Sequence, residues 1–286
     1  MKHIVCGILI GTAITGVLVG DDLIFSYKVG QFDVYMLVEN SRQAAPSILI
    51  GAKQDDVNRY LPSGTYTAET NTFLIKGEGK TVVVDTGFGT TIFDSMKKLG
   101  VSLADVDAVL LTHLHGDHIG GLSKGGKALF SKAKVYLATR EIQYWTINNV
   151  NQGAVNALKP YADNIETFNP GELDRGGTEI LPGIHAIAAF GHTPGHTVFL
   201  LESVGDRTVD RLLIWGDLMH VQGIQFPLPD VSVTYDTDPI AAAAVRKQIL
   251  AWATQTNTPV AGMHLAFPAI GSVKTDGNGY KFIPLN

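Results

Sequence analysis

At 286 residues with 45% hydrophobic side chains, the chain is long enough to bury a sizeable core without disulfide bonds. Its formal net charge of −5 and the absence of clustered lysine and arginine argue against a nucleic-acid-binding surface. The single cysteine, Cys6, excludes a disulfide framework and a thiolate zinc site, so any metal site must be built from histidine and carboxylate side chains.

The first 20 residues have the form of a secretory signal peptide. Lys2-His3 supplies a short positive start, residues 4–19 are apolar with small residues among them, and two aspartates follow. The stretch is short for a membrane span, which needs about 20 apolar residues. We expect residues 1–20 to be a signal peptide and residues 21–286 a single domain, exported to the periplasm or secreted. A cytoplasmic or membrane-anchored protein is the alternative.

The first half of the chain predicts mostly strands. Short β-rich runs predict strands over residues 23–29, 32–38, 71–75, 81–85 and 106–112. Residues 90–99 predict a helix that ends at Gly100. Residues 40–65 are polar and irregular, which predicts a loop.

The second half alternates strands with helices. Strands are predicted over residues 134–138, 179–187, 197–202, 211–215 and 259–262. One helix is predicted over residues 140–148. A second begins at Asp238-Pro239, where Asp can cap and Pro fits the first turn, and ends near residue 254. This mixture predicts a layered α/β domain with sheet inside and helices outside.

The strongest chemical signal is His113-Leu114-His115-Gly116-Asp117-His118, which follows the apolar run 109–112 directly. A strand delivers these side chains into a loop, and Gly116 permits a tight backbone path there. Neutral imidazoles and a carboxylate are the ligands that Zn²⁺ and similar ions accept. The alternative is a polar surface loop whose histidines occur by chance.

Three later segments also place a ligand-type side chain at a strand end. They are Gly191-His192-Thr193-Pro194-Gly195-His196, Trp215-Gly216-Asp217 and Gly262-Met263-His264. Any one of them alone would be weak evidence, because a lone histidine at a strand end is more often a hydrogen-bonded structural residue. Ligands of open α/β sheets gather at strand ends, so the four segments together predict a metal site.

In this order, the segments resemble the metallo-β-lactamase superfamily over about residues 70–268. The resemblance implies a four-layer αββα sandwich with two metal ions at one edge, zinc first, with Mn, Fe or Co as alternatives. It implies that one ion is bound by His113, His115 and His196, the other by Asp117, His118 and His264, with Asp217 bridging both. His192 is expected to be structural.

The resemblance also gives Asp85, in the segment Val84-Asp85-Thr86-Gly87, the role of supporting a metal-binding histidine from behind. A turn-initiating aspartate is the alternative. The substrate pocket is expected to include Phe88, Trp145, His220 and Phe267. For Trp145, packing of a helix on the core is an equally good interpretation.

Two positions distinguish branches of the superfamily. Its commonest zinc β-lactamases have Cys where this chain has Asp217, and its redox di-iron members have Glu where this chain has His115, so hydrolysis other than of penicillins is favoured. Segments 221–227, 236–239 and 264–271 resemble the group that includes methyl parathion hydrolase and lactone-cleaving enzymes. That group is often dimeric, so a homodimer is a candidate assembly.

The resulting hypothesis is a dinuclear hydrolase of a small-molecule lactone, ester or phosphotriester. Two ions about 3.5–4 Å apart would share a hydroxide, and Asp117 would orient it as the catalytic residue. No Gly-x-Ser-x-Gly segment supplies a serine nucleophile. The alternatives are a non-catalytic metal-binding protein on the same fold, a β-lactam or thioester hydrolase, and an oxygen-using redox enzyme.

Overall fold

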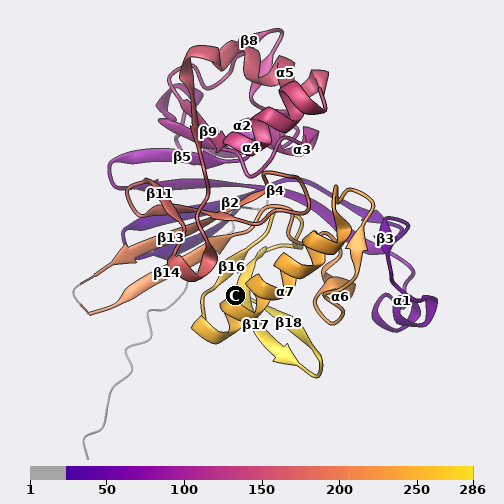
Figure 1. Cartoon of the computed structure of the whole chain (residues 1–286). Coiled ribbons are helices and arrows are strands. Elements are labelled where there is room, and N and C mark those ends of the chain that lie inside the picture. The colour runs from indigo at the N-terminus through magenta and orange to yellow at the C-terminus, as the bar shows by residue number, and fades with distance from the viewer. Residues whose placement is uncertain (1–23, 206, 286) are drawn as a thin grey trace, which may run out of the picture.

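The computed structural model describes residues 24–205 and 207–285, which form a four-layer αββα sandwich. Two seven-stranded sheets face each other, with helices on their outer faces (Figure 1). The predicted fold class is therefore confirmed. The expected signal peptide lies outside the described residues and stays a prediction. Among the described residues, no helix is both long and apolar enough to cross a membrane.

The first sheet has the order β1-β2-β4-β5-β6-β9-β10. Its strands are β1 (Ile24–Val29), β2 (Phe32–Ala44), β4 (Tyr66–Gly77), β5 (Lys80–Val84), β6 (Ala108–Leu110), β9 (Lys134–Ala138) and β10 (Ile165–Phe168). Neighbours are antiparallel from β1 to β5 and parallel from β5 to β10. The parallel strands end at one edge of the sheet, which is where the first histidine segment begins.

The second sheet has the order β11-β12-β13-β14-β16-β17-β18. Its strands are β11 (Thr178–Leu181), β12 (Ile184–Ala188), β13 (Thr197–Val204), β14 (Val209–Ile214), β16 (Val260–Ala261), β17 (Ile270–Asp276) and β18 (Gly279–Pro284). Its one parallel pair is β14 with β16, because the chain returns to the same end of the sheet through a long helix.

Seven α-helices are described: α1 (Gln54–Tyr60), α2 (Ile92–Lys98), α3 (Gly116–Ile119), α4 (Thr139–Gln143), α5 (Gln152–Leu158), α6 (Gln222–Gln225) and α7 (Pro239–Thr256). Two small ladders pair β3 (Leu49–Ile50) with β15 (Ser232–Val233) and β7 (Ser123–Lys124) with β8 (Lys127–Ala128). As predicted, Asp238 caps α7, accepting hydrogen bonds from the backbone of Ile240 and Ala241.

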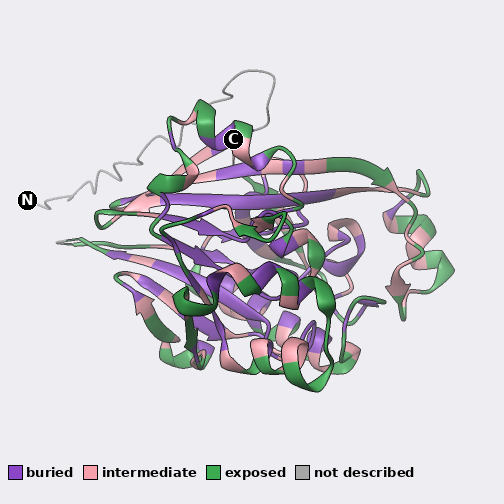
Figure 2. Ribbon diagram, turned by 90° about the horizontal axis from the view of Figure 1, so that it is seen from above, coloured by how far each residue is buried: buried purple, intermediate pink, exposed green. Residues whose placement is uncertain are grey.

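The apolar run of β5 shows how the layers form. Val82 and Val84 belong to the core between the two sheets, whereas Val83 packs with α2 residues such as Ile92 on the outer face. Successive side chains of a strand point to opposite faces, so a strand covered on both sides must be apolar throughout. Figure 2 shows the resulting buried interior in purple.

Three segments differ from the predictions. The stretch 40–65 is only partly irregular: β2 runs on to Ala44 beside β4, and β3 and α1 follow. It looked irregular because much of it is exposed and the ladder shifts register between Val38 and Asn40. The single strand predicted over 179–187 is a hairpin that turns at Gly183, whose φ is +70°. Two strands, β17 and β18, follow the strand predicted to be the last.

Candidate metal centre and active site

Four strand ends from the two sheets meet at one edge of the sandwich. His113 follows β6 of the first sheet by three residues, whereas His192, Asp217 and His264 follow β12, β14 and β16 of the second. The chain continues from His113 into α3, whose first turn contains Asp117 and His118. Residues more than 100 positions apart are thereby brought together without any of them belonging to a long flexible loop.

Asp217 lies at the centre of the cluster and faces it with both carboxylate oxygens. Oδ2 is 3.1 Å from His192 Nε2 and 3.5 Å from His113 Nε2. Oδ1 is 3.0 Å from His118 Nε2 and 3.1 Å from His264 Nε2. The two oxygens therefore face two different sets of imidazoles.

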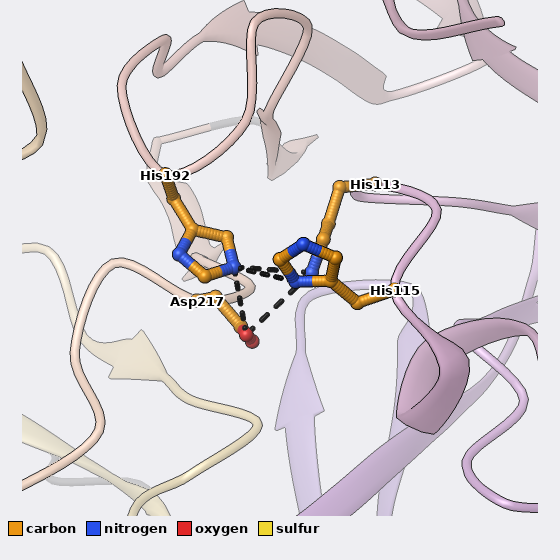
Figure 3. Close-up of side chains that lie close together, drawn as sticks. All are labelled: His113, His115, His192 and Asp217. Carbon is orange, nitrogen blue, oxygen red and sulfur yellow. Dashed lines mark hydrogen bonds and ion pairs between the residues drawn. The ribbon is translucent and has the colours of Figure 1, made fainter. Parts of the chain in front are cut away.

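The first set comprises His113, His115, His192 and Asp217, whose nearest ligand-type atoms all lie within 4.8 Å of one another. His192 Nε2 is 3.2 Å from His113 Nε2 and 3.0 Å from His115 Nδ1 (Figure 3). The close-up shows these side chains pointing at a common point, His113 and His115 from one segment and His192 and Asp217 from two others. This is the arrangement that a shared cation would require.

The second set comprises Asp117, His118 and His264. Asp117 Oδ2 is 3.8 Å from His118 Nε2 and 3.6 Å from His264 Nε2. His220 adjoins this set: its ring stacks on that of His264 at 4.7 Å, and its Nε2 is 3.1 Å from Asp217 Oδ2.

Unsatisfied polar atoms show that these residues fit a metal. His118 Nε2, His264 Nε2 and Asp217 Oδ1 are buried and have no hydrogen-bond partner of acceptable geometry, although they approach one another within 3.0–3.1 Å. A buried polar atom left without a partner costs about 1–3 kcal/mol, so such groups are rare in folded proteins. Imidazole nitrogen and carboxylate oxygen are ligands of Zn²⁺ and similar divalent ions, which would satisfy all three atoms.

The structure corrects the assignment of His196 as a ligand. Its Nδ1 lies 3.0 Å from the carbonyl oxygen of Ala189, and its Nε2 accepts a hydrogen bond of 3.0 Å from the backbone N–H of Asp217. Both ring nitrogens are therefore engaged, and neither faces the cluster. Burial lowers the pKa of His196 to about 3, so the ring is neutral, as an acceptor at Nε2 must be.

His192, expected to be structural, takes the place of His196 in the first set. Its Nδ1 is 2.9 Å from Asp236 Oδ1, which leaves Nε2 aimed at the cluster. Asp236 also accepts from the backbone of Val233 and lies 3.8 Å from the buried guanidinium of Arg246. Burial alone would lower the pKa of His192, but Asp217 and Asp236 outweigh it and raise the pKa to about 9.

Asp85 lies where the sequence predicted it. Its Oδ2 is 2.7 Å from His118 Nδ1, and its carboxylate also accepts from the backbone N–H and the hydroxyl of Thr112. The backbone at Asp85 is left-handed, with a φ of +57°, which is unusual for a residue other than glycine. This turn directs the carboxylate back under the histidine segment, where it orients His118.

Glu141, which sequence reasoning missed, connects the two histidine segments. Oε1 accepts from the backbone N–H of Leu114 at 3.0 Å and from Trp145 Nε1 at 2.7 Å. Oε2 accepts from the Thr193 hydroxyl and the Gly195 N–H, both at 2.8 Å. Glu141 is buried, and that burial raises its pKa despite the four hydrogen bonds. One side chain thus fixes the loop that carries His113 and His115 against the loop that carries His192.

The contact between the His192 loop and α4 leaves no spare volume at Gly195. A Cβ added at Gly195 would lie 2.4 Å from the backbone nitrogen of Glu141, so only glycine fits. The Gly in the Pro-Gly-His sequence is therefore explained by close approach of backbone rather than by an unusual φ.

The remaining histidines differ in pKa, depending on whether burial or the nearby carboxylates have the larger effect. Burial lowers the pKa of His115 to about 3 and that of His113 well below its ordinary value. Burial would do the same to His118, but Asp217 and Asp117 raise its pKa well above its ordinary value. In the metal-free protein, protons on some of the imidazoles balance the carboxylates, and these are the protons a divalent ion would displace.

A cavity of about 440 Å³ opens onto the cluster and is lined by His115, Asp117, Asp217, His220 and His264 among others. Of the predicted pocket residues, Phe88 and His220 line this cavity. Trp145 and Phe267 do not: Trp145 is held by Glu141, and Phe267 packs edge-on against Phe25 of the core at 6.1 Å. A larger hollow of about 600 Å³ lies beside β1 and β14 and contains no histidine.

The family model described as the metallo-beta-lactamase superfamily matches residues 66–249 of the chain. The chain belongs to this superfamily. The match begins at the first residue of β4 and ends within α7, so it contains every residue of the cluster except His264.

Two curated proteins of Bacillus subtilis are similar to about half of the chain. "Probable metallo-hydrolase YybB" of Bacillus subtilis (strain 168) is 29% identical over 154 residues, 52% of this chain and 61% of YybB. YobT of the same organism is 30% identical over 159 residues, 54% of this chain and 63% of YobT. The alignments therefore span less than two thirds of these curated relatives.

Two solved structures are similar over nearly the whole chain. One is the hydrolase AbOPH of the β-lactamase superfamily, with a TM-score of 0.83, 26% identity and coverage of 93% of this chain and 98% of that one. The other is AidC, a dizinc quorum-quenching lactonase in complex with a product, with a TM-score of 0.83, 25% identity and coverage of 93% and 99%.

Proposed function

We propose that this superfamily member is a hydrolase that holds two divalent metal ions, zinc first, and cleaves a small-molecule lactone, ester or phosphotriester. The observation that carries the proposal is the position of Asp217, whose two oxygens face two sets of imidazoles at 3.0–3.5 Å. The similarity to a dizinc lactonase and to a hydrolase supports the same class of reaction.

The proposed holders of the first ion are His113, His115 and His192, and those of the second are Asp117, His118 and His264, with Asp217 shared between them. When bound, two such ions supply Lewis acidity toward a carbonyl or phosphoryl oxygen and a hydroxide at neutral pH.

The chain's own residues would orient the reacting groups and move the proton. Asp117 has the most accessible carboxylate of the cluster, with 26% of its side chain exposed, and it lines the cavity. Burial opposes ionisation of Asp117, but His118 and His264 outweigh it and lower its pKa, so the carboxylate is ionised and can accept a proton. It would take the proton of the attacking water and return it to the leaving oxygen.

Asp85, Asp236 and Glu141 would act indirectly, as positioning residues. Each is buried and fixes a histidine ring or a histidine-bearing loop, so the donor atoms are held in place before a substrate enters. The cavity above them is within the size range of small-molecule sites.

The test is metal analysis followed by assay of lactones, aryl esters, phosphotriesters, thioesters and β-lactams. We expect about two equivalents of metal per chain and turnover of at least one of the first three classes. His115→Ala should lower turnover about 1,000-fold, which corresponds to about 4 kcal/mol of activation free energy. His185→Ala is the matched control, because His185 lies on β12 outside the cluster. A metal-loaded protein that hydrolyses none of these compounds would favour a non-catalytic metal-binding protein.

A further inference from the structure

One wall of the cavity is the exposed end of the β2–β4 ladder. Asn40 and Arg42 on β2 line it, as do Tyr66, Ala68 and Thr70 on β4. These are alternate positions on each strand, and the register pairs Asn40 with Thr70 and Arg42 with Ala68, so they share one face of the sheet. Of the residues between them, Glu69 also lines the cavity, whereas Gln43 and Thr67 do not and are hydrogen-bonded to each other.

This wall is continuous with the metal-donor cluster. His264 Nδ1 lies 2.6 Å from the carbonyl oxygen of Glu69, the residue that follows Ala68. Arg42 lies on the strand beside Ala68, one strand spacing away, which is about 4.8 Å. A small molecule bound at the cluster would therefore have this wall beside it, with Arg42 farther along it.

Arg42 is the one lysine or arginine that lines the cavity. Within the described part of the chain, its guanidinium makes no hydrogen bond and no ion pair. Glu69 also lines the cavity, but Glu69 Oε1 accepts from the Ser41 hydroxyl, and burial raises the pKa of Glu69, which disfavours its charged form. The chain as a whole has more acidic than basic residues, 27 against 22, so a cation without an acidic partner is notable.

Two tyrosines adjoin Arg42. Burial raises the pKa of Tyr66, Tyr235 adds to the rise and Arg42 opposes it, which indicates that the three groups lie close together. Tyr66 and Tyr235 both line the cavity, and no hydrogen bond engages either hydroxyl among the described residues. A guanidinium flanked by free hydroxyl donors is a favourable partner for an oxyanion.

Apolar surface shares the cavity with Arg42. Ile48 and Ala68 line it, and Phe88, with 47% of its surface exposed, lies at its edge. An apolar spacer would cover these side chains, whereas a short polar molecule would leave them in water.

We propose that the substrate carries a carboxylate at the end remote from the bond that is cleaved, joined to the reacting group by an apolar spacer, and that Arg42 binds this carboxylate. A single cation matches one negative charge better than the roughly two charges of a phosphate monoester. This inference rests on the proposed hydrolase function.

The experiment uses the metal-loaded protein and matched pairs of esters. The probes are 4-nitrophenyl monoesters of glutaric and adipic acid, whose far end is a free carboxylate, and their methyl esters, whose far end is neutral. We expect kcat/KM to be about tenfold higher for the free carboxylates, through a lower KM. Arg42→Gln should remove this difference and change turnover of the methyl esters less than about twofold.

Two further variants sharpen the test. Arg42→Lys keeps the charge but not the forked donors, and should retain part of the preference. Arg175→Gln removes the same charge from an exposed site paired with Glu172, and should leave the preference intact.

Equal kcat/KM for both members of each pair would overturn the carboxylate subsite but not the proposed hydrolase function. Equal slowing of both members by Arg42→Gln would also overturn it. Absence of turnover on these esters and on every compound of the earlier panel would remove the proposed function instead.

Discussion

His192 and His196 lie four residues apart in one loop, yet they face different parts of the molecule. His192 directs Nε2 into the cluster and Nδ1 toward Asp236. His196 directs both nitrogens to the backbone, one to the Ala189 carbonyl and the other to the N–H of Asp217. The first can give a lone pair to a cation, whereas the second fixes the peptide that carries the shared carboxylate.

The difference lies in the position of each histidine relative to the neighbouring strand. His192 occupies the loop that follows β12, beyond the edge of the sheet, whereas His196 directly precedes β13 and is enclosed by the core. A histidine beyond a strand end can approach a shared point with others, but one next to a strand is surrounded by backbone groups that need partners.

His192→Ala and His196→Ala should affect different properties, the first metal content and turnover, the second stability. These are the largest effects that we expect. His192→Ala should remove one equivalent of metal and lower turnover about 1,000-fold, because a direct donor is lost. His196→Ala should leave two buried backbone groups without partners and lower the free energy of unfolding by about 2–6 kcal/mol, since each such group costs about 1–3 kcal/mol. Metal analysis and chemical denaturation measure the two effects. If His196→Ala lost a metal equivalent and His192→Ala did not, His196 and not His192 would be the metal donor.

Glu141→Gln should weaken metal binding about 10- to 100-fold while the protein stays folded. An amide has one acceptor oxygen, so its NH₂ group must face donors in one of the two histidine segments that Glu141 now joins. A competition assay with a chelator measures the affinity. Glu166→Gln is the control, because Glu166 is an exposed partner of Lys134. Unchanged affinity in Glu141→Gln would show that the loops hold their positions without this link.

Asp236→Asn should have a smaller effect, a loss of about tenfold in metal affinity. The amide oxygen can still accept from His192 Nδ1, but the neutral group no longer increases the basicity of the ring. His196 has no carboxylate at Nδ1, so the same change has no counterpart there. Isothermal titration with zinc measures the effect, and a loss as large as that of His192→Ala would mean that the substitution displaces the ring itself.

The smallest expected difference between the two histidines is in the pH dependence of stability of the metal-free protein. The pKa of His196 is about 3 in the folded state, so acidification below about 6.5 protonates it only in the unfolded chain and lowers stability. The pKa of His192 is about 9, so its contribution is fully present below pH 6.5 and is lost as pH rises through 9. NMR titration of each imidazole would check this, and a His196 ring that titrates near pH 6.5 would contradict it.

The sequence was sufficient where neighbouring residues determine the geometry. His113, His115, Asp117 and His118 follow one buried strand, and a strand end followed by a short helix leaves them few directions to face. The role of Asp85 came from the resemblance to the superfamily, and the structure explains its position, since β5 and β6 are adjacent parallel strands that end together.

The sequence was insufficient where the partner comes from elsewhere in the chain. Nothing local shows that Glu141 lies between two loops, or that Asp236 selects His192 as the outward-facing ring. Trp145 was predicted as a pocket residue because it is aromatic, but its ring packs edge-on against that of His115 at 5.5 Å while Nε1 donates to Glu141, and it does not line the cavity. The orientations of these side chains depend on hydrogen bonds between distant segments, and the spacing of residues in one sequence does not encode those bonds.

In the proposed dinuclear site, Asp217 would give one oxygen to each set of imidazoles, so the two sets should not load independently. A first cation would immobilise Asp217, whose peptide is already restrained by His196, and would present the second oxygen in its final direction. Uptake of a second cation would then lose less conformational freedom than uptake of the first, and loading should be cooperative. At limiting metal, the population would divide into empty and fully loaded molecules, with few in between.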